Sequence, residues 1–129
     1  MKRALKPEEK EQIKFVAWLR ANNIFHFSVV NENNMSGKNR LMASLIGEHN
    51  KKMGKVAGVS DLVIFLPAHI IFLEMKKPQE TLKNGQKSKR EMRSKAQIEF
   101  CENVDRFDYS FGAVCYGAEE AIDLIQDHL

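Results

Sequence analysis

The sequence has little of what marks several protein classes. Its 129 residues include two cysteines, seven glycines and three prolines, which excludes a disulfide scaffold and a collagen-like or low-complexity chain. No apolar run approaches the ~20 residues of a membrane-spanning helix. No apolar stretch follows the basic start MKRALK, so we expect no secretory signal. These features predict one globular domain over residues 1–129, in the cytoplasm and without membrane association.

Zinc-type ligand spacing is also missing. Cys101 and Cys115 form no CxxC or Cys/His pattern, so we expect two buried thiols in a reducing compartment. The four histidines show no ligand spacing either, and we interpret them as structural or exposed.

Basic residues are nearly absent from the last quarter of the chain. Residues 1–95 hold 19 of the 20 lysines and arginines and nine of the 17 acidic residues, a balance of +10. Residues 96–129 hold only Arg106 against eight carboxylates, a balance of −7. This asymmetry indicates one basic face suited to a polyanion and an acidic face elsewhere.

The hydrophobic pattern alternates between helix and strand periods. The predicted elements are a helix (7–23), a strand (24–30), a polar loop (31–40), a possible helix (41–53), two strands (60–66 and 69–76), a charged segment (77–95) with a turn at Asn84-Gly85, a helix capped by Ser94, a strand (109–116) and a closing helix (118–129). This order predicts an α/β fold with a mixed central sheet flanked by helices.

The two central strands place acidic residues opposite each other. If the hairpin turn is centred between Pro67 and Ala68, Asp61 faces Glu74 with Cβ atoms about 4.5–5.5 Å apart. A loop of odd length would change this register. Lys76 lies two residues after Glu74 and therefore on the same face.

Two adjacent carboxylates repel each other unless something binds between them. A divalent cation resolves this, because Mg²⁺ prefers hard oxygen ligands such as carboxylates. The backbone carbonyl of Met75 is a further candidate ligand. Lys76 is then placed to act on water or phosphate. Charged residues on an exposed strand face are the alternative, but the flanking runs LVIFL and IIFL indicate a buried hairpin.

The runs GVSDLVIF and IFLEMKKP resemble the PD-(D/E)xK nuclease signature, and specifically the virus-type replication–repair nuclease (VRR-NUC) domain. Ser60 stands where the superfamily name has proline. Other segments that resemble this family, in the same order along the chain, are Glu8-x-x-x-Gln12 with Trp18-Leu19, Val30-Asn31-Glu32, the run KMGKVAG before the acidic motif, Ser94-x-x-Gln97, and AVCYGAEEAIDLI.

The resemblance implies a restriction-endonuclease-like PD-(D/E)xK core and a role for each motif residue. Asp61 and Glu74 would bind Mg²⁺ or Mn²⁺, Lys76 would be the catalytic lysine, and Gln97 would contact water or phosphate. Glu8 would approach the metal through water, although helix phase leaves Glu9 or Glu11 open. The lysines and arginines expected to contact DNA phosphates are Lys51, Lys52, Lys55, Lys83, Lys87, Lys89, Arg90 and Arg93.

The function implied is a metal-dependent, structure-selective DNA endonuclease similar to Holliday-junction resolvases. Small members of the family tend to be homodimers, which suits branched DNA as the substrate. The resemblance further implies a phage or prophage origin and a role in DNA repair inside a bacterial or phage-infected cell. Two alternatives remain open: a flap or single-strand nuclease subunit of a repair complex, and a catalytically silent DNA-binding module of the same fold.

Overall fold

The computed structural model describes residues 4–29 and 40–129, and its elements follow the predicted order. Val30-Asn31-Glu32 and most of the predicted polar loop lie outside the described residues. The elements are α1 (Pro7–Ala21), β1 (His26–Ser28), α2 (Arg40–Lys52), β2 (Leu62–Phe65), β3 (Ile70–Lys76), α3 (Lys95–Val104), β4 (Ser110–Tyr116) and α4 (Ala118–His128). The possible helix after residue 40 is therefore real.

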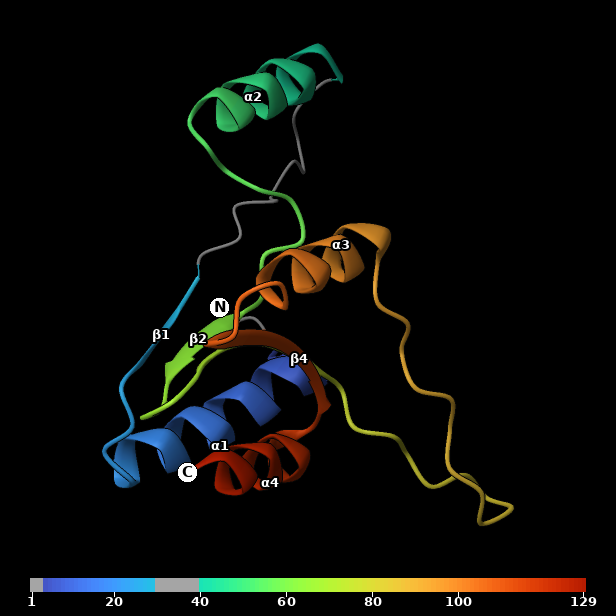
Figure 1. Cartoon of the computed structure of the whole chain (residues 1–129). Coiled ribbons are helices and arrows are strands. Elements are labelled where there is room, and N and C mark those ends of the chain that lie inside the picture. Colours follow the sequence, from blue (N-terminus) through green and yellow to red (C-terminus); the bar gives the residue numbers. More distant parts are fainter. Residues whose placement is uncertain (1–3, 30–39) are drawn as a thin grey trace.

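The strands form one mixed sheet in the order β1-β2-β3-β4. β1, β2 and β3 are antiparallel neighbours, whereas β4 lies parallel to β3. A parallel pair needs a long crossover, and here the crossover comprises segment 77–95 and helix α3. The predicted α/β class with a mixed sheet is confirmed (Figure 1).

Helices cover the two faces of the sheet unequally. α1 and α4 pack on one face, where Phe15, Leu19 and Ile125 are fully buried against β2 and β3. α3 covers the other face (Figure 1). Gly112 of β4 permits this close approach, because a Cβ there would lie 2.6 Å from the sulfur of Cys101.

Both cysteines are buried and free, as predicted. Burial raises the pKa of Cys115 to about 12. No helix in the described part of the chain is long and apolar enough to cross a membrane.

The β2–β3 hairpin has the predicted register. Leu62 pairs with Leu73 and Phe65 with Ile70, and the N–H of Leu66 donates to the carbonyl of His69 at 2.8 Å. Extending this register by one residue places Asp61 opposite Glu74, on the sheet face that α3 covers.

Segment 77–95 leaves the body as a narrow excursion between β3 and α3 (Figure 1). Its turn at Asn84-Gly85 is confirmed, with Gly85 at a φ of +84°. Thr81 and Lys87 form an isolated antiparallel bridge, and the N–H of Ser88 donates to the carbonyl of Glu80 at 2.8 Å. The excursion is therefore a short hairpin rather than an unstructured loop.

Candidate active site

Asp61 is held at the start of β2 by main-chain hydrogen bonds on both sides. Its carboxylate Oδ2 accepts the N–H of Met75 at 2.9 Å, and its carbonyl accepts the N–H of Val29 at 2.9 Å. The first bond ties the acidic residue to β3, and the second ties it to the chain leaving β1. The side chain is therefore positioned by three neighbouring strands of the sheet.

Glu74 is a buried carboxylate in an unfavourable environment for a negative charge. The residue is 9% exposed, and its Oε2 is buried without a hydrogen-bond partner within the described residues. Burial, followed by the charge of Asp61, raises the pKa of Glu74 to about 7, while Lys76 opposes the shift. Burial also raises the pKa of Asp61, against the Met75 hydrogen bond and the charge of Lys76.

Gln97 reaches the acidic pair from the first turn of α3. The amide Nε2 of Gln97 donates to Oε1 of Glu74 at 2.9 Å. Its own Oε1 accepts the N–H of Ser94 at 2.9 Å, and its N–H donates to the Ser94 hydroxyl at 3.1 Å. This capping box fixes the Oε1 end of the Gln97 amide, which leaves Nε2 to face Glu74.

Gly58 lets the chain before β2 pass directly against this helix start. Its φ is +76°, and a Cβ would lie 2.3 Å from the carbonyl carbon of Ala96 and 2.6 Å from the nitrogen of Gln97. Only glycine meets both requirements without strain. The run before the acidic motif therefore has a packing role in the site.

Lys76 lies on the same face as Glu74 and is largely buried. Its side chain is 12% exposed, and its Nζ lies 4.0 Å from Oε2 of Glu91. The sequence interpretation missed Glu91. Its position depends on the return of segment 77–95, where the Tyr116 hydroxyl donates to the Glu91 carbonyl at 2.8 Å. No local pattern signals such a contact.

The three glutamates of α1 have different environments. Glu9 accepts the N–H of Lys6 at 3.2 Å within the helix cap. Glu11 accepts the N–H of Ala118 at 3.1 Å and pairs with Lys14 at 3.0 Å, so it joins α1 to α4. The charge of Glu8 contributes to the raised pKa of Asp61. Glu8 as the glutamate that approaches the metal stays a prediction.

The residues present fit a hard divalent cation. Asp61 and Glu74 provide adjacent carboxylates, and the unpartnered Oε2 of Glu74 is a buried oxygen ready for a ligand. Over residues 4–29 and 40–129, no three or more His, Cys, Asp or Glu side chains gather closely enough to hold a metal ion. A third acidic ligand therefore does not join the pair directly, and ligation by Glu8 through water or by the Met75 carbonyl stays a prediction.

The lysines expected to contact DNA are all exposed. Lys51 and Lys52 end α2, and the others are Lys55, Lys83, Lys87 and Lys89.

The two arginines of the set have contacts within the chain. Arg90 pairs with Glu120 at 3.2 Å, donates to Gln79 at 3.4 Å, and lies 4.6 Å over the ring of Tyr116. Arg93 hydrogen-bonds the Cys101 thiol. Burial raises the pKa of this thiol, and the charge and hydrogen bond of Arg93 oppose that rise. Arg90 thus anchors segment 77–95 to β4 and α4.

Known proteins share this fold, which has a mixed sheet, an acidic pair on the central hairpin and α3 above that pair. No protein-family model matches the sequence, and no curated protein matches it. A solved structure titled "VRR_NUC domain protein" is similar, with a TM-score of 0.60, 21% sequence identity, and coverage of 98% of this chain and 91% of that chain. The chain therefore has a VRR_NUC-like fold, as the sequence resemblance predicts.

Proposed function

We propose that this protein is a metal-dependent DNA endonuclease that hydrolyses phosphodiester bonds in branched DNA. The observation that carries the proposal is the arrangement around Glu74: an adjacent Asp61, an amide from Gln97, a nearby buried lysine and one unpartnered carboxylate oxygen. A buried acid beside a half-buried one destabilises a fold, so a bound cation is the simplest reason for their presence.

Asp61 and Glu74 would hold the cation, Mg²⁺ or Mn²⁺. When bound, the ion supplies Lewis-acid chemistry, because it neutralises phosphate charge and acidifies water. Lys76 places an ammonium group on the same sheet face and stabilises negative charge on the phosphate. Gln97 orients the Glu74 carboxylate, and the N–H of Met75 orients that of Asp61.

A homodimer suits a branched substrate, because two sites related by a two-fold axis face two strands of a junction. Support for a partner surface comes from α2, which has no buried residue and stands away from the sheet (Figure 1). Leu41 and Leu45 are exposed on it. An exposed apolar helix side of this kind suits a partner that covers it.

Nicking of supercoiled plasmid with and without Mn²⁺ tests the enzyme. Asp61→Asn and Glu74→Gln should lose cleavage, while metal-free DNA binding persists or tightens because a negative charge facing phosphate is removed. Glu102→Gln, an exposed glutamate of α3, is the matched control and should cleave like the wild type.

Each alternative has its own outcome. DNA binding without metal-dependent nicking by the wild type would leave a silent DNA-binding module. A panel of four-way junction, flap, single-strand and duplex substrates separates the junction resolvase from the flap or single-strand nuclease. Preference for flaps or single strands over the junction would replace the resolvase proposal by the flap or single-strand nuclease.

A further inference from the structure

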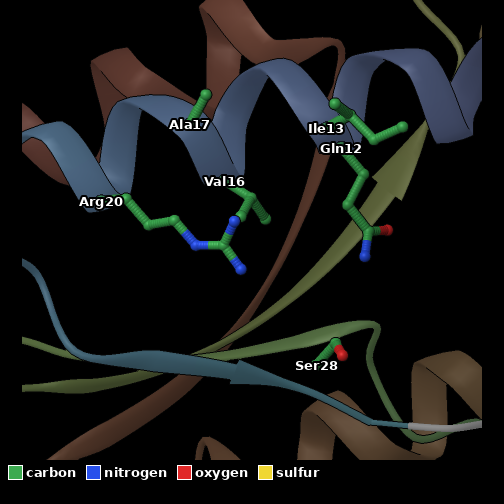
Figure 2. Close-up of a pocket in the computed structure, with 6 residues that line it drawn as sticks. All are labelled: Gln12, Ile13, Val16, Ala17, Arg20 and Ser28. Carbon is green, nitrogen blue, oxygen red and sulfur yellow. The ribbon is translucent and has the colours of Figure 1, made fainter.

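A groove of about 330 Å³ separates α1 from the edge strand β1 and lies outside the acidic site described above. Figure 2 shows the side chains of Gln12 and Arg20 reaching from α1 toward β1, where Ser28 lies across from them. The groove is lined by Gln12, Ile13, Val16, Ala17, Arg20 and Ser28.

The lining combines an apolar wall with hydrogen-bond donors and a single charge. Ile13, Val16 and Ala17 are apolar, Gln12 and Ser28 carry donors, and the one charged group is the Arg20 guanidinium. Within residues 4–29 and 40–129, the side chains of Gln12 and Arg20 make no hydrogen bond or ion pair. A guanidinium that has no partner among the described residues, beside neutral donors and with no carboxylate among the described lining residues, suits an anion.

One end of the groove lies near Asp61 along the sheet edge, because Ser28 pairs with Leu62, the residue after Asp61. Gln12 is one helical turn after Glu8. Ser28 precedes Val29, whose N–H donates to the Asp61 carbonyl at 2.9 Å. Arg20 is twelve residues after Glu8, which is about 18 Å further along the helix. The groove therefore leads away from the site along α1.

We propose that this groove binds the sugar–phosphate backbone of one unpaired DNA strand that runs into the active site. The Arg20 guanidinium forms a bidentate contact to a phosphate a few nucleotides from the scissile bond, and Gln12 and Ser28 contact phosphate or sugar oxygens. This inference rests on the proposed nuclease function and adds a substrate feature to it: an unpaired strand next to the cleaved bond.

The size of the groove selects a single strand. Its volume of about 330 Å³ is at the lower end of the range for small-ligand sites, about 300–1,000 Å³, which suits a nucleotide-sized segment of one strand. The apolar wall suits the faces of sugars and bases, which unpaired strands expose. A branched DNA provides such a strand wherever its arms separate.

A structural role for Arg20 makes a different prediction. Arg20 lies in the last turn of α1, where any cation interacts favourably with the helix dipole. Lysine would serve that role equally, but lysine cannot replace the planar fork that binds phosphate in a bidentate way. Arg20→Lys therefore separates the two roles: stability should be kept, and the bidentate geometry of the phosphate contact should be lost while its charge remains.

The experiment measures DNA binding by fluorescence anisotropy in EDTA, with the full-length wild type, Arg20→Ala and Arg20→Lys. One probe is a duplex with two unpaired arms, and the other is a fully paired duplex of the same length. The control is Arg106→Ala, an exposed arginine that donates to Asn103 at 3.2 Å. Thermal denaturation of each variant checks that the fold is kept.

We expect Arg20→Ala to lose about five- to tenfold affinity for the forked probe and less than about twofold for the duplex, and Arg20→Lys to lose less than Arg20→Ala on the forked probe. For Arg20→Ala the slope of log affinity against log salt on the forked probe should fall by about 0.7, the value for one phosphate contact on a single strand, whereas for Arg20→Lys it should stay unchanged because the charge is kept. The Arg106 control should match the wild type on both probes.

Equal affinity of wild type and Arg20→Ala for the forked probe would overturn the inference and leave the nuclease proposal intact. Equal loss on both probes would also overturn it, because Arg20 would then contact duplex DNA. If the wild type neither binds DNA nor nicks plasmid, the nuclease proposal fails, and the inference fails with it.

Discussion

Glu74 is the residue at which folding and chemistry conflict most clearly. It is buried beside Asp61 with one oxygen unpartnered, and its pKa rises to about 7 as a result. Since the folded state binds this proton more tightly than the unfolded chain, the metal-free protein should be most stable while Glu74 is protonated. Below pH about 4.5 that contribution is fully present, and it is lost as the pH rises through about 7.

Glu74→Gln should remove this part of the pH dependence. Because glutamine stays neutral, the metal-free variant should be more stable than the wild type at pH 8, by at most about 3 kcal/mol, and similar to it at pH 5. Urea denaturation in EDTA at both pH values measures the difference. Added Mg²⁺ or Mn²⁺ should stabilise the wild type at pH 8 and leave the variant unchanged. If the free energy of unfolding changed with pH in the same way for both proteins, this account would be contradicted.

Lys76 acts on the same carboxylates from a different position. Its charge lowers the pKa of both Asp61 and Glu74, and its side chain is 12% exposed beside Glu91.

We expect Lys76→Ala to reduce single-turnover cleavage about a hundredfold or more, the usual cost of a lost charge-stabilising group. Metal affinity at pH 8 should change little, while the pH profile of metal binding shifts upward because the Glu74 pKa rises. Calorimetry and single-turnover rates, compared with Lys77→Ala as control, test this. Equal losses of metal affinity and rate would make Lys76 a structural residue.

At the scale of elements, the active site depends on where α3 begins. The Ser94 cap fixes the Gln97 amide, and Gly58 allows the preceding chain to touch that first turn. The helix start is thus both a secondary-structure boundary and a positioning device for Glu74.

Gly58→Ala should destabilise the fold by about 1–3 kcal/mol, because the new Cβ combines a positive φ with contacts to the Ala96 backbone. The cleavage rate should fall further than the loss of folded protein explains, because the new Cβ also displaces Gln97. Gly47→Ala is the matched control: a Cβ there meets nothing within 4 Å, and alanine favours a helix by up to about 1 kcal/mol. Denaturation midpoints and cleavage rates of the two variants give the comparison. A stable, fully active Gly58→Ala protein would remove this role.

Segment 77–95 carries seven basic and two acidic residues and few apolar anchors. The amides of Leu82, Gly85 and Ser88 have hydrogen-bond acceptors within its hairpin. We expect hydrogen exchange in this segment to be faster than in β3, slowest at those three amides, and slower throughout on addition of branched DNA. Exchange as slow as that of β3 in the free protein would contradict the expected mobility.

For the whole molecule, the charge asymmetry and the exposed α2 point in the same direction. In the proposed function the acidic last quarter of the chain faces away from DNA, and the basic surfaces of two protomers would form one binding surface. The apolar side of α2 provides a contact through which two copies could join.

Light scattering at micromolar concentration should therefore give a dimer for the wild type. Leu45→Asp should give a monomer, because a charge is placed on the exposed apolar side of α2, while Leu82→Asp, at the exposed hairpin tip, should stay dimeric. The dimer should bind a four-way junction more tightly than linear duplex, with a steeper salt dependence, at about −0.9 per phosphate contact on duplex DNA. A wild-type monomer with equal affinity and slope on both substrates would contradict the resolvase proposal.

The sequence by itself determined the order of elements, the mixed sheet class and the register of the central hairpin. These depend on short-range information: hydrophobic period, turn residues at Pro67 and Gly85, and a Ser94–Gln97 cap that lies within one turn. A hairpin with a short turn leaves few registers that keep its apolar face buried. The opposition of Asp61 and Glu74 follows from that register alone.

The tertiary structure decided which side chains complete the site. The Gln97 amide on Glu74 and Glu91 beside Lys76 both join segments that are distant in sequence. The exposure of α2 and the groove beside Arg20 likewise depend on how helices pack on the sheet. Local patterns carry periodicity and turn chemistry, whereas these contacts depend on helix phase and on the path of a crossover, which are set only when the whole core packs.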